Sequence, residues 1–213
     1  MSEQDAREAV IKTAQEMSAS GLSPGKSGNV SARAAGGMLI TPTGVAYAEL
    51  TPEMISFVAM DGASRTGELK PSSEWHFHLG IYQARKDVGA IVHTHSEAAT
   101  ALACTGQGIP AFHYMVAVAG GTDIRCAPYA TFGTEALAVH AVEALKDRKA
   151  CLLGNHGVIA CGDTPAAALT LANEVEALAA QYGRALLIGG VRILTDTQMR
   201  EVLEKFSTYG QQS

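Results

Sequence analysis

Basic residues are too few in this sequence to form an electrostatic surface for nucleic acid. Lysine and arginine number 16 against 21 acidic residues, the formal net charge is -5, and hydrophobic residues make up 47% of the chain. A nucleic-acid-binding domain shows a basic excess, and a disordered chain combines low hydrophobicity with high net charge. The composition therefore excludes both classes. It predicts a globular protein with one domain over residues 1–213.

Long apolar runs and a targeting segment are also missing. No stretch approaches the ~20 apolar residues of a membrane span, and residues 1–5 are acidic, unlike the basic start of a secretory signal. The four cysteines show no C-x-x-C spacing and lie in apolar contexts, which indicates reduced, buried thiols. We expect a cytoplasmic protein with neither a membrane nor a nucleic acid as partner.

Hydrophobic periodicity and turn residues predict a mixed α/β fold. Apolar residues at helical spacing predict helices at residues 3–20, 71–84, 97–104, 133–146, 165–188 and 196–206. Short apolar runs predict strands at residues 30–33, 38–41, 55–60, 90–95, 124–127, 150–153 and 158–161. Two pairs of these strands are each joined by a tight turn, as in β-hairpins: 30–33 with 38–41, and 150–153 with 158–161. An all-parallel sheet is therefore disfavoured.

The best candidate for chemistry is the histidine pair at the end of the predicted strand 90–95. Side chains two positions apart on a strand project from the same face, so His93 and His95 can direct two imidazoles at one metal ion. A further ligand is needed, and His156 in a glycine-flanked turn is the best candidate. From the spacing alone, a metal-binding pair and a hydrogen-bonded pair of core histidines both stay open.

His76 and His78 form a second H-x-H pattern, but on a predicted helix. Positions two apart on a helix lie on nearly opposite sides, so these two side chains cannot chelate one ion. We expect one of them at the surface and the other packed inside.

Two stretches could bind a phosphate group. The glycine-rich loop at residues 25–29 is not a nucleotide-binding P-loop, because Ser20 stands where that pattern requires glycine and a helix precedes it. Such a loop can still wrap an anion with backbone N–H groups, or be only a tight turn with positive φ. Ser72 and Ser73 could bind phosphate at a helix start or form an ordinary cap. Glu74 would matter most if it faced the histidines, as a metal ligand or a general base.

Taken together, several motifs resemble the class II aldolase/adducin-head family. The motifs are residues 28–33 (GNVSAR), 39–44 (LITPTG), 71–74 (PSSE), 93–95 (HTH) and 155–157 (NHG), and the likeness continues through residues 113–115, 126–133 and 203–210. No single motif is specific, but the set is, and the likeness runs almost from end to end. The resemblance implies a three-layer αβα sandwich with a largely antiparallel central sheet.

The resemblance also implies the residues of the site. It implies Zn²⁺ held by His93, His95 and His156, with Glu74 as a ligand that moves away to become the catalytic acid/base. The residues implied to bind the substrate phosphate are Gly28, Asn29, Thr43, Gly44, Ser72 and Ser73. The family assembles as a homotetramer, in which Tyr114 enters a neighbouring subunit's site as a second catalytic residue. Phe132, Phe206 and Tyr209 are implied to shape the aldehyde pocket.

The implied activity is reversible retro-aldol cleavage of a small phosphorylated sugar. The candidate substrates are L-fuculose 1-phosphate and 5-deoxy- or 5-methylthio-ribulose 1-phosphate, and the products are dihydroxyacetone phosphate and an aldehyde. The pentulose-5-phosphate 4-epimerases, dehydratases and decarboxylases of the family share the metal site and remain alternatives. A non-catalytic adducin-like interaction module is disfavoured, because all four ligands are present. The sequence departs from the aldolase pattern at two places: Lys26 in the phosphate loop would strengthen or reposition phosphate binding, and residues 96–98 after His95 leave the aldehyde open.

Overall fold

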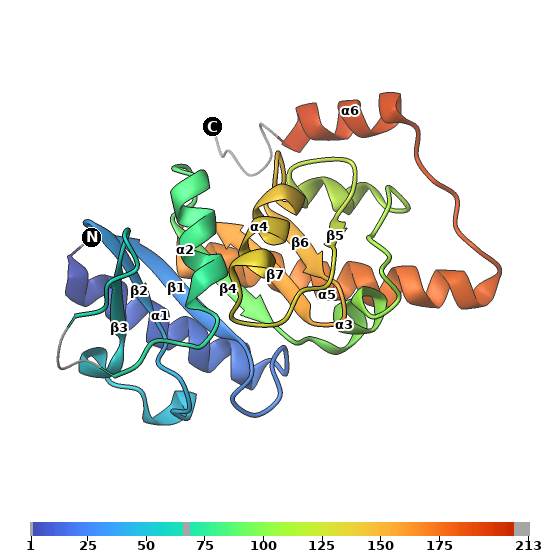
Figure 1. The fold of residues 1–213 in the computed structure, drawn as a ribbon. Helices are drawn as coiled ribbons and strands as arrows, with labels where there is room; N and C mark the ends of the chain where they lie inside the picture. Colours follow the sequence, from blue (N-terminus) through green and yellow to red (C-terminus); the bar gives the residue numbers. More distant parts are fainter. Residues whose placement is uncertain (1, 66–68, 207–213) are drawn as a thin grey trace, which may run out of the picture.

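The computed structural model describes residues 2–65 and 69–206, whose strands form one seven-stranded sheet (Figure 1). The strand order is β3-β2-β1-β4-β7-β6-β5, and every neighbouring pair is antiparallel except β5 with β6. The strands are β1 (Asn29–Ala34), β2 (Gly37–Ile40), β3 (Ser56–Ala59), β4 (Ala90–Thr94), β5 (Arg125–Ala127), β6 (Ala150–Leu153) and β7 (Gly157–Gly162).

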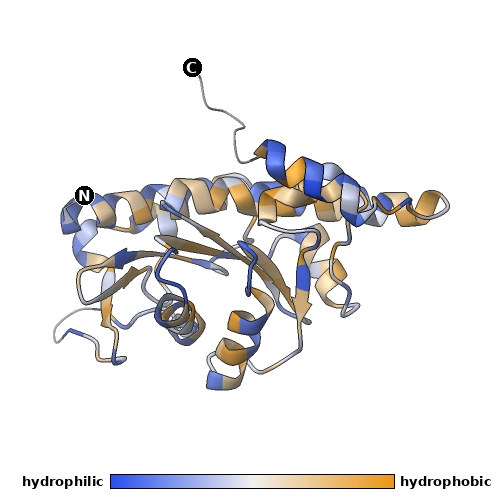
Figure 2. Cartoon of the chain, turned by 90° about the horizontal axis from the view of Figure 1, so that it is seen from above, coloured by the Kyte–Doolittle hydropathy of each residue, from blue (hydrophilic) through white to orange (hydrophobic). Residues whose placement is uncertain are grey.

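Helices cover both faces of this sheet, which Figure 2 shows between two helical layers. One layer holds α1 (Glu3–Ala19), α3 (Glu97–Ala103), the 3-10 helix η3 (Tyr114–Ala119), α5 (Pro165–Ile188) and α6 (Asp196–Phe206). The other holds α2 (Trp75–Ala84) and α4 (Glu135–Ala144). The short 3-10 helices η1 (Tyr47–Glu49) and η2 (Pro52–Met54) lie between β2 and β3. The expected three-layer αβα sandwich with a largely antiparallel sheet is confirmed.

Strand β4 runs through the middle of the sheet and alternates between the two cores. Val92 packs into the core under α1 and α5, while Ile91 packs into the core under α2 and α4. Two-residue periodicity therefore turns His93 toward α2, where its ring meets Phe77 edge-on with the ring centroids 5.2 Å apart. Thr94 is buried on the opposite face.

Some element boundaries and two cysteines differ from expectation. The helix predicted from residue 71 begins at Trp75, because Pro71 forms a β-bridge with Pro42, and the N–H of Trp75 closes a turn on the Ser72 carbonyl. Of the four free cysteines, Cys151 and Cys161 are buried as expected, whereas Cys126 is half-buried and Cys104 is exposed. Cys104 is the C-cap residue of α3, beyond the last helical position. None of the helices in the described part of the chain has the length and apolar character to cross a bilayer.

Candidate metal and substrate site

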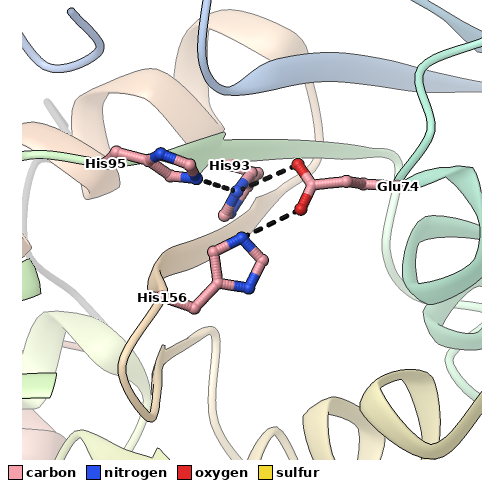
Figure 3. Close-up of side chains that lie close together, drawn as sticks. All are labelled: Glu74, His93, His95 and His156. Atoms are coloured by element: carbon pink, nitrogen blue, oxygen red, sulfur yellow. Dashed lines mark hydrogen bonds and ion pairs between the residues drawn. The ribbon is translucent and has the colours of Figure 1, made fainter. Parts of the chain in front are cut away.

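Four side chains from separate parts of the chain converge at one end of the sheet (Figure 3). Glu74 lies just before α2, His93 on β4, His95 just after β4, and His156 in the turn between β6 and β7. One possible ligand atom from each lies within 4.8 Å of all the others. The structure thus brings together the four residues implied as metal ligands.

The polar atoms of this cluster face one another. The Nε2 atoms of His93 and His95 are 3.0 Å apart, and the Glu74 carboxylate lies 3.2 Å from Nε2 of His93 and 2.9 Å from Nε2 of His156. His93 Nδ1 lies 2.8 Å from the carbonyl oxygen of Val158 and donates to it, since a carbonyl can only accept. In neutral His93 the Nε2 lone pair therefore points into the cluster, as a metal ligand requires.

The electrostatics of the site favour an ionised Glu74 and a neutral His95, the states in which these two side chains can bind a metal ion. Burial alone would raise the pKa of Glu74. The His93 charge and the hydrogen bonds from His156 and His93 together outweigh burial and hold this pKa well below 4.5. Burial, followed by the charges of His93 and His156, lowers the pKa of His95 to about 4. A charged carboxylate beside a neutral imidazole at pH 7 fits a divalent metal ion, because metal ligands must be deprotonated.

Neighbouring elements fix the segment that carries His95. The backbone N–H of His95 donates to Ser23 Oγ at 3.4 Å. The Glu176 carboxylate of α5 accepts from the first free N–H groups of α3, those of Ala98 at 2.8 Å and Ala99 at 2.9 Å. A carboxylate at a helix N-terminus also suits the helix dipole. This cap holds the unusual segment 96–98 in place directly after the cluster.

A cavity of about 390 Å³ opens beside the cluster. Glu74, His95 and His156 are on its wall, while His93 lies fully buried behind them. The cavity is also lined by all six residues implied to bind phosphate, namely Gly28, Asn29, Thr43, Gly44, Ser72 and Ser73. The possible metal ligands and the residues implied to bind phosphate therefore share one cavity.

Tyr47 holds the glycine-rich loop against this cavity. Its hydroxyl lies 2.6 Å from the Gly28 carbonyl oxygen and 3.0 Å from that of Ser27. Burial, followed by the Glu74 charge, raises the pKa of Tyr47 to about 12, so the hydroxyl stays a donor. Sequence reasoning missed this residue, because an isolated tyrosine between turns carries no spacing signal.

Gly28 meets two requirements that only glycine satisfies. Its φ is +81°, and a Cβ there would come within 2.4 Å of Ser23 Oγ and 2.6 Å of the His93 carbonyl oxygen. Both the positive φ and the close approach to β4 exclude a side chain. The loop therefore contains the expected tight turn with positive φ, and this turn also lines the cavity, so a phosphate-binding role for it stays a prediction.

We expect Gly28→Ala to lower thermal stability and weaken binding of inorganic phosphate, because backbone strain of ~1–3 kcal/mol adds to the clash. Gly25→Ala is the matched control: its φ is +66°, but a Cβ there meets nothing within 4 Å. Thermal unfolding and phosphate titration calorimetry compare the two variants. Equal stability and equal phosphate affinity would contradict this account of Gly28.

The segment before α2 is not an ordinary helix cap. Ser72 is buried, and its Oγ accepts from the N–H of Glu74 at 3.3 Å, two residues on. No side chain caps α2, whose N-cap residue is Glu74 itself. The first N–H groups of α2 are thus not used by a neighbouring hydroxyl, and Ser73 is exposed at the cavity.

Of the residues implied to act on the aldehyde side of the substrate, some line the cavity of their own chain and others lie away from it. Phe132 lines the cavity, whereas Tyr114 is 51% exposed on η3 and does not line it. Phe206 of α6 lies beside Tyr114, with the ring centroids 6.5 Å apart, and is likewise not on this cavity wall. Tyr209 lies outside the described residues. The roles implied for Tyr114, Phe206 and Tyr209 stay predictions.

Two further residues on the wall were not foreseen. Tyr129 lies on the same loop as Phe132, and Asn155 precedes the ligand His156. Asn155 has a φ of +54°, and its N–H donates to the Ala103 carbonyl at 3.1 Å. Asparagine tolerates this left-handed conformation better than most residues. An asparagine directly before His156 was therefore the available sequence signal for a tight turn at the site.

Comparison with known proteins agrees with this site. A 5-methylthioribulose-1-phosphate/5-deoxyribulose-1-phosphate aldolase of Rhodospirillum rubrum is 54% identical over 96% of this chain and 92% of its own. An L-fuculose phosphate aldolase of Escherichia coli is 51% identical over 94% of each chain. A solved structure of an L-fuculose 1-phosphate aldolase superposes with a TM-score of 0.92 at 40% identity, over 95% of this chain and 96% of that one. Residues 8–182 match the family described as the class II aldolase and adducin N-terminal domain. The chain belongs to this family.

Proposed function

We propose that this chain is a zinc-dependent aldolase that reversibly cleaves a ketose 1-phosphate to dihydroxyacetone phosphate and an aldehyde. The observation that carries the proposal is the single cavity that joins the Glu74 and histidine cluster to the six implied phosphate-binding residues. The names of the two curated relatives, both aldolases of phosphorylated ketoses, support the reaction class.

The donor set favours zinc as the metal. Three imidazole nitrogens and one carboxylate oxygen are ligands that catalytic zinc sites use. The Nε2 atoms of His93 and His95 lie 3.0 Å apart. A tetrahedral site with Zn–N bonds of about 2.0–2.1 Å has ligand atoms about 3.3 Å apart. The pair is therefore near the spacing that zinc requires.

The reaction breaks the C3–C4 bond and leaves negative charge on the dihydroxyacetone phosphate fragment. When bound, Zn²⁺ would act as a Lewis acid toward the oxygens of that fragment. Glu74 would add a proton at C3 in cleavage and remove it in synthesis, as a general acid/base. Binding of the phosphate by the six implied residues of the same cavity would hold the reacting carbons beside Glu74, which lowers the entropic cost of reaction.

Tyr114 would exchange a proton with the oxygen at C4 of a substrate bound to a neighbouring chain. Its half-exposed position, away from its own chain's cavity, suits such a role. This assignment goes together with the proposed homotetramer, whose active sites lie between subunits.

The proposed activity is tested by release of dihydroxyacetone phosphate from a panel of ketose 1-phosphates and pentulose 5-phosphates. We expect release from L-fuculose 1-phosphate or a 5-substituted ribulose 1-phosphate, abolished by a chelator and restored by Zn²⁺. The preferred substrate names the aldehyde. No release from any ketose 1-phosphate, with zinc bound, would overturn the aldolase assignment in favour of the epimerase, dehydratase or decarboxylase branches. Absence of bound metal would favour the interaction module.

Lys26 is expected to strengthen binding of the substrate phosphate. Its Nζ lies 2.9 Å from the Gly44 carbonyl oxygen on the cavity wall. Replacement by threonine should raise KM about two- to fivefold at low salt with little change in kcat, since exposed charge interactions are worth ~0.2–1 kcal/mol. The difference should shrink at high salt. Lys12→Thr, on the exposed side of α1, is the control; a fall in kcat with unchanged KM would argue against this role.

A further inference from the structure

A chain of buried hydrogen bonds leads from the core between β1 and α2 to Glu74. Tyr82 Oη lies 2.9 Å from Ser31 Oγ, which lies 2.7 Å from His78 Nδ1. His78 Nε2 is hydrogen-bonded to Asn29 Oδ1, and Asn29 Nδ2 donates to Glu74 Oε2 at 2.8 Å. All five residues are buried, and His78 and Ser31 have no exposed surface.

Strand register explains how these residues meet. Asn29 of β1 pairs directly with His93 of β4, which places β1 beside the strand that carries the metal ligands. Val30 packs into the core under α1, so alternation turns Asn29 and Ser31 to the other face, toward α2. His78 is one helical turn after Glu74 and faces β1, where it contacts Ser31 and Asn29.

The direction of each hydrogen bond follows from its Glu74 end. An ionised carboxylate only accepts, so the Asn29 amide nitrogen must face Glu74 and the amide oxygen must face His78. That oxygen also only accepts, so the His78 proton is on Nε2. Neutral His78 then accepts at Nδ1 from the Ser31 hydroxyl, which in turn accepts from Tyr82. Burial, followed by the His93 charge, lowers the pKa of His78 to about 3, so the ring stays neutral.

We propose that His78 is a positioning residue for Glu74, acting through the amide of Asn29. Its Nε2–H fixes which end of the Asn29 amide faces the carboxylate; a reversed amide would place an oxygen against Glu74 Oε2. One Nδ2 hydrogen is the only donor of the Asn29 side chain left for a substrate phosphate. This proposal rests on the proposed acid/base role of Glu74.

The position of His78 separates this role from ligand binding. His78 is fully buried, does not line the cavity and is not in the group of possible metal ligands. Its replacement therefore removes neither a cavity-wall atom nor a metal donor. A positioning role predicts that kcat falls by more than KM rises, at constant metal content.

The test compares His78→Leu with His78→Gln. Leucine removes the donor at similar volume, whereas the glutamine amide can still donate to Asn29. We expect the leucine variant to lose about 10- to 100-fold in kcat, as when a hydrogen bond that supports a charged group is lost. Zinc content should stay within about twofold of the wild type, KM should rise by less than kcat falls because Asn29 also faces the phosphate, and glutamine should restore most of kcat. Ser56→Ala on β3, which removes the part-buried hydrogen bond from Ser56 Oγ to the Leu69 carbonyl, is the stability control and should leave kcat unchanged.

A spectroscopic readout is independent of turnover. In protein labelled with ¹⁵N-histidine, with and without zinc, His78 should be the neutral Nε2–H tautomer. A Nδ1–H tautomer, or an unchanged kcat in a folded leucine variant, would overturn the proposal. If the leucine variant does not fold, the proposal is tested by the tautomer of His78 in the wild type and by the kcat of the glutamine variant. Inactivity of the wild type toward every sugar phosphate, with the Nε2–H tautomer present, would refute the proposed function and leave the hydrogen-bond chain intact.

Discussion

The His93→Ala variant is expected to lose bound metal and activity together. His93 is fully buried at the centre of the sheet, and its Nδ1 hydrogen bond to Val158 fixes the ring so that Nε2 faces His95 and Glu74. Alanine removes one of the three nitrogen donors of the cluster. Loss of an outer-shell partner alone costs metal sites about 10–100-fold in affinity, so loss of a ligand should cost more.

Metal content after dialysis and release of dihydroxyacetone phosphate measure the two losses on the same sample. His140→Ala is the matched control, because His140 lies on α4 outside the cluster, with its Nδ1 3.2 Å from the Pro128 carbonyl oxygen. Stoichiometric zinc with full activity in His93→Ala would show that the cluster is not the catalytic centre.

Glu74→Gln is expected to lower the rate about 10²–10⁴-fold, the usual contribution of a positioned acid or base. Glutamine keeps the size of the side chain and an oxygen that can accept from Asn29, but it cannot take up a proton at neutral pH. The histidines remain, so most of the metal should remain bound. The fold should be preserved, because no core residue changes.

Exchange of the C3 protons of dihydroxyacetone phosphate in D₂O, followed by NMR, isolates the proton transfer from bond cleavage. The wild type should catalyse this exchange stereospecifically without any aldehyde, and Glu74→Gln should not. Glu53→Gln changes an exposed carboxylate outside the cavity and serves as the control. Unimpaired exchange in the Glu74 variant would remove this residue from the acid/base role.

Local patterns in the sequence predicted the strand that carries His93 and the face on which it lies. Two-residue periodicity is a property of one strand and needs no partner. The same reasoning separated His76 from His78 and correctly placed one of them, His78, inside; the other, His76, is half-buried against Trp75 and not at the surface as expected. The family likeness, not spacing, added His156 and Glu74 as firm members of the cluster.

Contacts between distant segments could not be predicted in this way. The bond from Asn29 to Glu74 joins residues 45 positions apart, and that from Asn29 to His78 joins residues 49 apart. Both depend on the register of β1 against β4 and on the start of α2 at Trp75, which local periodicity does not determine. Tyr47 is similar, since its role arises only when η1 folds back onto the glycine-rich loop.

The cavity is lined partly by residues held on regular secondary structure and partly by residues on an exposed loop, and these two parts differ in how readily they accept substitutions. Glu74 and the histidines are held by the sheet, by α2 and by a tight hairpin turn, whereas Tyr129 and Phe132 are more than 60% exposed on the loop between β5 and α4. Loops accept substitutions and insertions that strands do not. Mutant libraries restricted to residues 129–132 should therefore yield altered aldehyde preference at unchanged metal occupancy, and natural divergence in substrate could follow the same route.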